Sequence, residues 1–286
     1  MKPAAFAYER ATSVSQALER VQEAPGAKFL AGGQSLLAVM NYRLARPARL
    51  VDIGKLGELC RVFEEPESML LGGLCSHRFV ETDELIGRRL PLLREAAHHI
   101  GHVAIRNCGT LGGTIAHADP AAELPAALIA LGASIFVERH GQQRRELAVA
   151  DLYQGFYSTL LEDTDLITWV RVPTLAAGSG WGFKEVSRRH GDFAEAGCAA
   201  VVRHSEGGLT ARLVLFGVAD RPLLFERTLH DGDPESWSAL AHDLASQLEP
   251  TDRADYRRRL AAHCITSAGS DAQQRLSGEQ GGERRV

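Results

Sequence analysis

The stretch Ala31-Gly32-Gly33-Gln34-Ser35-Leu36 decides how the N-terminal part of this chain is interpreted. The apolar residues 28–31 predict a short strand before it, and residues 36–44 predict a helix after it. A double glycine at such a junction lets the backbone approach a ligand and point successive N–H groups at an anion. Taken alone, the stretch favours an ordinary strand-to-helix turn, and the alternative is a phosphate or pyrophosphate site.

A second double glycine follows in Asn107-Cys108-Gly109-Thr110-Leu111-Gly112-Gly113-Thr114. We expect residues 107–120 to form a glycine-rich loop system, with a strand-like run at residues 114–116. Two such loops could hold one pyrophosphate from both sides. Neither contains G-x-G-x-x-G, and the chain has no G-x-x-x-x-G-K-[ST], which argues against a Rossmann NAD site and a P-loop.

Two carboxylates and a lysine come next. Asp119 and Glu123 flank a predicted Pro-started helix at residues 123–131. Their position suits either stabilisation of the first helical turn or hydrogen bonding to a ribose hydroxyl. Lys184, in Phe183-Lys184-Glu185-Val186, could place a positive charge beside a phosphate or a flavin ring, and the alternative is a strand with solvated charges.

The composition is that of an ordinary globular protein of one large domain or two to three smaller ones. Of its 286 residues, 45% are hydrophobic and 24% charged, and the net charge of −4 makes nucleic acid an unexpected partner. No apolar run is long enough for a membrane span, and the N-terminus lacks a signal-peptide pattern, so we expect a cytoplasmic location. The 5 cysteines form no C-x-x-C pair, which argues against a metal or iron–sulfur centre held by this chain.

The predicted elements fall into three blocks and a tail. Residues 1–56 form a small α/β unit, residues 57–175 a second unit of helices and strands, and residues 277–286 a disordered tail. The third block, residues 176–276, is predicted to hold strands at 181–186, 196–203 and 209–218 and helices at 235–248 and 252–263. His98, His99 and His102 are interpreted as surface or helix-end histidines.

The order of these motifs resembles the FAD-binding medium subunit of molybdenum hydroxylases, the group of carbon monoxide dehydrogenase medium chain and the xanthine dehydrogenase flavin domain. The resemblance covers roughly residues 3–265. The stretches that carry it are residues 31–36, Ile105-Arg106-Asn107, residues 110–114, residues 118–126, residues 183–186, Asp192-Phe193-Ala194, residues 217–222 and residues 255–260. Two positions depart from the family pattern: Ala104 stands where Gln is frequent, and Glu195 where a small apolar residue is usual.

The resemblance implies an α+β fold. It would comprise a two-subdomain FAD-binding domain of the vanillyl-alcohol-oxidase (PCMH) type and a C-terminal α+β domain of the CO dehydrogenase flavoprotein type. The backbone of residues 29–36 and 110–114 would hold the pyrophosphate, Glu123 the adenosine end and Leu166 or Ile167 the adenine, with Ile100 and Lys184 beside the flavin. The implied cofactor-binding residues are Phe29, Leu30, Ala31, Gly32, Gly33, Gln34, Ser35, Leu36, Ile100, Thr110, Leu111, Gly112, Gly113, Thr114, Asp119, Glu123, Leu166, Ile167 and Lys184.

The resemblance also implies a role and partners. The chain would be a flavoprotein oxidoreductase subunit without catalytic residues or metal ligands of its own. It would take electrons from the [2Fe–2S] clusters of a small partner, serve a large molybdopterin-binding partner, and pass the electrons to an external acceptor, in a dimer of heterotrimers (a heterohexamer). One alternative is a stand-alone FAD-dependent oxidoreductase of the same fold. Another is a silent module that has lost FAD, against which both double glycines argue.

Overall fold

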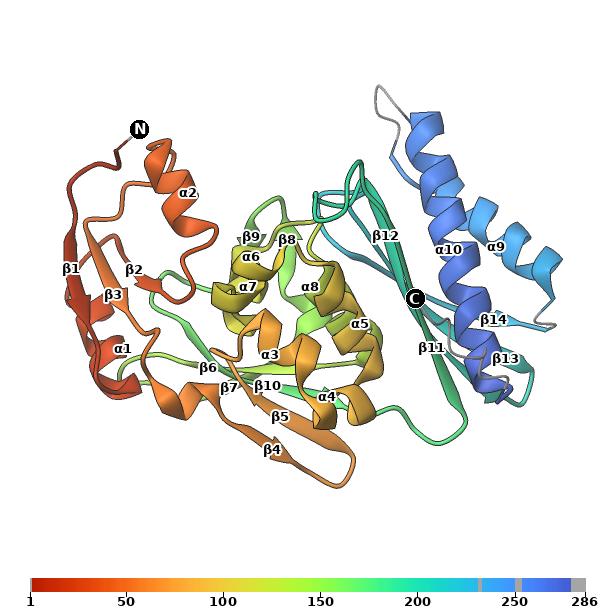
Figure 1. Ribbon diagram of the computed structural model, residues 1–286, viewed down its shortest axis with the longest axis horizontal. Helices are drawn as coiled ribbons and strands as arrows, with labels where there is room; N and C mark the ends of the chain where they lie inside the picture. The colour runs from red at the N-terminus through yellow and green to blue at the C-terminus, as the bar shows by residue number, and fades with distance from the viewer. Residues whose placement is uncertain (1, 231–232, 250–253, 279–286) are drawn as a thin grey trace.

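The computed structural model describes residues 2–230, 233–249 and 254–278, and it sets three sheet-containing units in a row (Figure 1). The three larger sheets use strands from residues 7–52, 62–173 and 179–229. The predicted tail lies mostly outside the described residues, which end in a turn at Ser277 and Gly278.

The N-terminal unit is a parallel sheet of order β1-β3-β2 with two helices. Its elements are β1 (Ala7–Arg10), α1 (Val14–Gln22), β2 (Ala27–Leu30), α2 (Leu36–Asn41) and β3 (Arg49–Asp52). Ser13 caps α1 by accepting a hydrogen bond from the Gln16 N–H, and α1 buries Leu18 and Val21 against the sheet. β2 and α2 confirm the strand and the helix predicted on either side of the first glycine stretch, although α2 ends at Asn41 and not at Leu44.

The middle unit is an antiparallel sheet of order β4-β5-β10-β6-β7 with a layer of helices. Its strands are β4 (Val62–Glu64), β5 (Ser68–Gly72), β6 (Ser134–Glu138), β7 (Arg145–Ala148) and β10 (Leu166–Pro173). Its helices are α3 (His77–Thr82), α4 (Glu84–Arg89), α5 (Pro91–His99), α6 (Val103–Cys108), α7 (Leu111–His117) and α8 (Glu123–Leu131). Two short 3-10 helices, η1 (Gly57–Cys60) and η2 (Val149–Asp151), and a small hairpin of β8 (Tyr153–Gly155) and β9 (Ser158–Thr159) complete the unit.

The C-terminal unit is an antiparallel meander covered on one face by two helices (Figure 1). It consists of β11 (Ser179–Val186), β12 (Ala196–Ser205), β13 (Gly208–Phe216), β14 (Leu223–Leu229), α9 (Pro234–Ser246) and α10 (Ala254–Leu276). Strand alternation divides the sheet between two cores. Phe183 and Phe216 join the core of the middle unit, whereas Cys198 and Leu215 pack with α9 and α10.

The structure differs from the expected elements in several places. The strand-like run at residues 114–116 lies inside α7, because the Thr110 hydroxyl caps that helix and Leu111 and Ile115, one turn apart, are both buried. The last helix does not end at His263: it continues to Leu276, since a stripe of small residues faces β11. Strand β14 was not predicted at all. The helix after Asp119 begins at Glu123, so Pro120 precedes it and Pro125 lies in its first turn.

Candidate cofactor site

The two glycine stretches are in direct contact. A Cβ atom on Gly32 would lie 1.9 Å from the Cys108 carbonyl oxygen, which leaves room for no side chain. Gly33 has φ +70°, a left-handed conformation that favours glycine. The turn after β2 therefore lies against the end of α6, although the two segments are far apart in the sequence.

The first glycine stretch offers a run of unpaired donors. Within the described part of the chain, the backbone N–H groups of residues 32–36 have no hydrogen-bond acceptor. The carbonyl oxygens of the turn are occupied instead: Gly33 accepts from the Leu37 N–H at 3.1 Å, and Gly32 accepts from the Gln34 side-chain amide at 3.2 Å. Since these residues are only partly buried, the N–H groups can reach a ligand. Such a run suits an anion such as a pyrophosphate.

The second stretch differs, because its N–H groups are already used. Leu111 donates to the Cys75 carbonyl at 2.9 Å, Gly112 to Gly73 at 2.7 Å, and Thr114 to Thr110 at 3.0 Å. The Gly113 N–H donates to the Thr110 hydroxyl at 3.2 Å. A pyrophosphate contact by residues 111–114 remains a prediction that these paired groups do not support. This second stretch contributes the backbone surface at Cys108 and Gly109 against which Gly32 packs.

His77, which was not predicted as a site residue, fixes the backbone of this second stretch. Its backbone N–H donates to Gly109 at 2.9 Å, and its Nε2 lies 3.1 Å from the Thr110 carbonyl oxygen. Burial lowers the pKa of His77 to about 4, so the imidazole is neutral near pH 7. Nε2 then carries the proton, because a carbonyl can only accept. The sequence carries no signal for this role, since His77 is a lone histidine at the start of a helix.

A stack of close backbone contacts joins the second glycine stretch to β10. A Cβ on Gly112 would lie 2.8 Å from the Gly73 carbonyl oxygen, and one on Gly73 would lie 2.4 Å from that of Ile167. Ile167 and Leu166 are both 5% exposed. The structure thus brings Gly32, Gly112 and Ile167 into one contiguous region, as the predicted site requires.

The two predicted carboxylates are both buried but stand in different surroundings. Asp119 accepts from the Ala121 N–H at 2.9 Å and from the Tyr157 hydroxyl at 3.3 Å. Glu123 is 7% exposed at the first position of α8. Burial, followed by the charge of Glu185, raises the pKa of Glu123 to about 8. Glu123 is therefore mostly protonated at pH 7 and able to donate a hydrogen bond.

Ile100 and Lys184 have their recorded contacts with other parts of the fold. Ile100 ends α5, and its carbonyl accepts from Arg106 Nη1 at 2.8 Å. Lys184 pairs across the sheet with Cys198, whose side chain belongs to the core shared with α9 and α10. Its side chain therefore starts on the face of β11 opposite to Glu185, which contacts His99. A place for Lys184 beside the flavin remains a prediction.

His99 is held between two carboxylates. Its Nε2 lies 3.4 Å from Glu95 and its Nδ1 3.4 Å from Glu185. Burial opposes protonation, but the hydrogen bonds to Glu185 and Glu95 outweigh it and raise the pKa of His99 to about 9. His98 instead contacts Glu81 at 3.0 Å. No group of histidine, cysteine and carboxylate side chains in the described residues is arranged to hold a metal ion.

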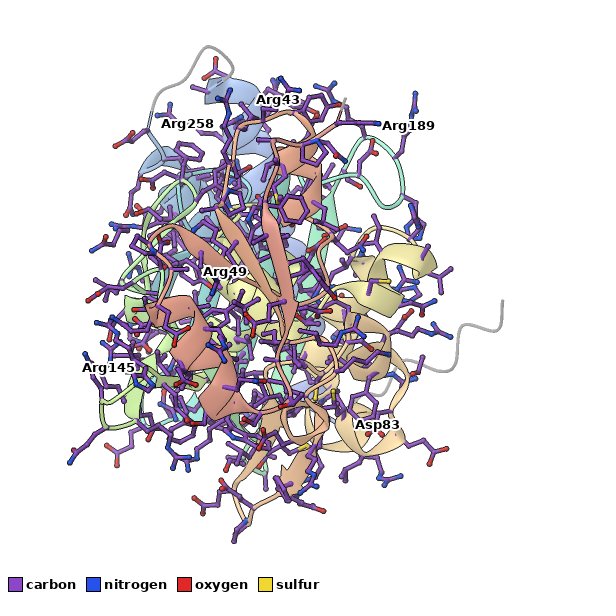
Figure 2. The ribbon with its side chains drawn as sticks, turned by 90° about the vertical axis from the view of Figure 1, so that its left-hand side faces the viewer. Arg43, Arg49, Asp83, Arg145, Arg189 and Arg258 are labelled. Atoms are coloured by element: carbon purple, nitrogen blue, oxygen red, sulfur yellow. The ribbon has the colours of Figure 1, made fainter. Side chains whose placement is uncertain are left out.

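A cleft of about 520 Å³ opens at the turn between β11 and β12. It is lined by Arg188, Gly191, Asp192, Phe193, Ala194, Glu195, Gly217, Tyr256 and Arg257. Glu195, the departure from the family pattern, accepts from Arg188 Nε at 2.6 Å and from the Tyr256 hydroxyl at 2.8 Å. The neighbouring Arg189 points away from the molecule into solvent (Figure 2).

Comparison with known proteins decides the family. The family described as FAD binding domain in molybdopterin dehydrogenase matches residues 4–175. The chain belongs to this family. It is 36% identical over 280 residues to the carbon monoxide dehydrogenase medium chain of Hydrogenophaga pseudoflava, covering 94% of this chain and 97% of the relative. It is 38% identical over 261 residues to the 6-hydroxypseudooxynicotine dehydrogenase complex subunit alpha of Paenarthrobacter nicotinovorans, covering 87% of each.

The solved structures confirm the α+β fold of the flavin chain. Carbon monoxide dehydrogenase from Hydrogenophaga pseudoflava, in a form lacking the Mo-pyranopterin moiety of the molybdenum cofactor, superposes with a TM-score of 0.89 at 35% identity, over 96% of this chain and 99% of that chain. The residues present fit FAD: the free N–H run at residues 32–36 suits its pyrophosphate, and the close contact of Gly32 with Cys108 holds that turn in place. Among the described helices, none combines the length and the apolar composition that a membrane span requires.

Proposed function

We propose that this chain is the electron-transfer flavin subunit of a molybdopterin-dependent dehydrogenase. The observation that carries the proposal is the run of unpaired N–H groups at residues 32–36, beside the close contact of Gly32 with Cys108. Those donors hold the FAD pyrophosphate. Bound FAD supplies the capacity to exchange electrons between one-electron and two-electron partners. Asp119, Glu123, Ile100, Leu166, Ile167 and Lys184 are proposed to contact the rest of the cofactor.

Substrate chemistry is proposed to take place on another subunit. Two relatives of nearly equal similarity, at 36% and 38% identity, are named for carbon monoxide and for 6-hydroxypseudooxynicotine. Similarity to these relatives therefore does not indicate which substrate the complex of this chain oxidises. A large molybdopterin-binding subunit would carry that reaction.

A small [2Fe–2S] subunit is proposed to deliver the electrons, and an external acceptor to remove them. The five cysteines of this chain are free thiols in the structure, three of them buried, and none forms a cluster motif. An iron–sulfur centre therefore belongs on a partner. We further propose a dimer of heterotrimers, located in the cytoplasm, where thiols stay reduced.

Co-expression tests the proposal. The chain is produced together with a large molybdopterin-binding chain and a small [2Fe–2S] chain from the same source, and it is isolated through its own tag. FAD, iron and molybdenum are then measured in the complex, together with bleaching of the flavin absorbance by substrate. The proposal expects all three in one complex and flavin bleaching that requires the iron–sulfur partner. A chain that carries FAD and oxidises a substrate alone would support the stand-alone oxidoreductase, and a chain that never binds FAD would refute both.

A further inference from the structure

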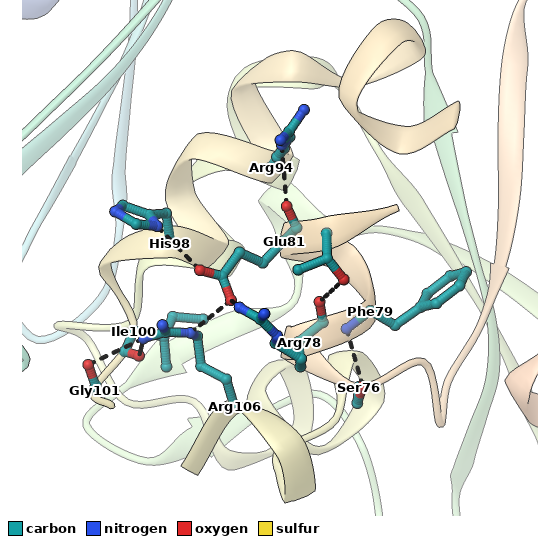
Figure 3. Close-up of polar contacts among 10 residues, drawn as sticks. Ser76, Arg78, Phe79, Glu81, Arg94, His98, Ile100, Gly101 and Arg106 are labelled. Atoms are coloured by element: carbon teal, nitrogen blue, oxygen red, sulfur yellow. Dashed lines mark hydrogen bonds and ion pairs between the residues drawn. The ribbon is translucent and has the colours of Figure 1, made fainter. Parts of the chain in front are cut away.

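A buried ion-pair network lies at the end of α3 (Figure 3). The Glu81 carboxylate, 8% exposed, accepts hydrogen bonds from Arg106 Nε at 2.8 Å and from Arg78 Nη1 at 2.9 Å, and it lies 3.0 Å from His98 Nδ1. Arg106 is itself only 7% exposed. A buried guanidinium needs such a partner, because removing it leaves an uncompensated charge.

The same guanidinium holds a turn of the backbone. Arg106 Nη1 donates to the carbonyl of Ile100 at 2.8 Å and to that of Gly101 at 3.2 Å. These carbonyls form the turn between α5 and α6, where Gly101 has φ +45°. The planar fork of arginine reaches the carboxylate and both carbonyls at once, which the single ammonium of lysine cannot do.

The turn held by Arg106 touches the C-terminal unit. A Cβ on Gly191, whose φ is +85°, would lie 2.7 Å from the Gly101 carbonyl oxygen. Gly191 lines the cleft between β11 and β12 together with Phe193. The backbone of the 100–101 turn therefore packs directly against the wall of that cleft.

The other end of α6 reaches the glycine stretch. α6 spans Val103–Cys108, and the Cys108 carbonyl lies where a Gly32 side chain would be. Helix α3 supports both ends: His77 in its first turn holds Gly109 and Thr110, and Glu81 in its last turn holds Arg106. The short helix α6 thus connects the N–H run at residues 32–36 with the cleft beside Gly191.

We propose that Arg106 is a positioning residue for the bound flavin. It fixes the turn at Ile100 and Gly101, and through α6 it fixes the distance between the pyrophosphate donors and the cleft. The proposal rests on the proposed function, because it needs FAD to bind at residues 32–36. It also needs the flavin to lie beside Ile100, as proposed above, because a cofactor held at both places binds more weakly when one of them moves.

A lysine substitution separates the geometry of Arg106 from its charge. In the full-length chain, Arg106→Lys keeps the positive charge near Glu81 but loses the clamp on two carbonyls. We expect FAD affinity, measured by flavin fluorescence titration, to fall by about tenfold or more. The visible circular dichroism of the bound flavin should change as well, which a merely less stable fold would not cause. Arg88→Lys, in the exposed pair with Glu84, is the matched control and should leave both unchanged.

A second variant tests the same contact if Arg106→Lys does not fold. Gly191→Ala pushes a methyl group against the Gly101 carbonyl, whereas Gly178→Ala introduces the same kind of backbone strain, at φ +74°, with no atom within 4 Å. The inference expects a changed flavin dichroism and weaker FAD binding for Gly191→Ala only. Wild-type affinity and dichroism in Gly191→Ala, or in a folded Arg106→Lys, would overturn it. Failure of the wild-type chain to bind FAD would instead overturn the proposed function.

Discussion

His99 Nδ1 lies 3.4 Å from Glu185 Oε1, and this ion pair joins the last turn of α5 to β11. The other ring nitrogen contacts Glu95, so the imidazolium bridges two carboxylates. Glu123 lies close enough for its pKa to respond to both Glu185 and His99. The contact between the middle and C-terminal units is therefore a titratable cluster.

The stability of the chain should fall as the pH rises from 6 to 9. His99 titrates at about 9 in the folded chain against 6.5 ordinarily, and Glu123 at about 8 against 4.5. Each pKa is raised by folding, so each contribution is complete below the ordinary value and is lost as the pH rises through the folded value. Glu123→Gln removes the part of this pH dependence that is due to Glu123. Its melting temperature, measured by thermal denaturation of the FAD-free chain, should therefore fall less steeply with pH than that of the wild type. Glu84→Gln, at a side chain 91% exposed, is the control, and parallel curves for Glu123→Gln and wild type would contradict the prediction.

Acid should weaken the segment held by His77. The folded pKa of His77 is about 4 and the ordinary value is 6.5, so the unfolded chain binds the proton more readily. The free energy of unfolding therefore decreases as the pH is lowered from 6.5. Between pH 7 and pH 5 this loss is about 2 kcal/mol. Urea denaturation of wild type and His77→Gln at both pH values measures it, since glutamine can keep the hydrogen bond to Thr110 without titrating. Equal pH dependence in both proteins would show that His77 is not the group responsible.

Gly32→Ala should abolish FAD binding. The added methyl group would lie 1.9 Å from the Cys108 carbonyl oxygen, so the turn must separate from α6 and the run of N–H donors is lost. Flavin content of the purified chain measures the effect. Gly57→Ala is a suitable control, because nothing lies within 4 Å of its Cβ position. Full flavin content in Gly32→Ala would place the pyrophosphate elsewhere.

Gly182→Ala should destabilise the C-terminal unit. Its Cβ would lie 1.9 Å from the Ala268 carbonyl oxygen, so β11 and α10 would have to move apart. Overpacking of this kind costs about 2 kcal/mol or more in the free energy of unfolding, measurable by urea denaturation. Gly207→Ala meets only the Thr228 methyl at 3.9 Å and should have little effect. Similar unfolding curves for the two variants would mean that α10 does not pack closely on β11.

Much of the fold follows from local patterns. The strand before the first glycine stretch and the helix after it were both predicted from apolar runs in the sequence, and they are β2 and α2. The strand wrongly predicted at residues 114–116 shows where local patterns stop predicting the secondary structure. Thr114-Ile115-Ala116 has β-branched residues, but the Thr110 cap and the burial of Leu111 and Ile115 favour a helix.

The site divides in the same way. By itself the sequence determined the two glycine-rich stretches, the order of the motifs and hence the resemblance to the family. Only the tertiary structure decided that the N–H groups of residues 32–36 stay unpaired while those of residues 111–114 are used, and that Lys184 starts on the opposite face of β11 from Glu185. Backbone conformation is governed by neighbouring residues in the chain, whereas the partner of each N–H group is a distant segment brought close by packing. For that reason the sequence could locate the donors but could not show which of them remain free for a ligand.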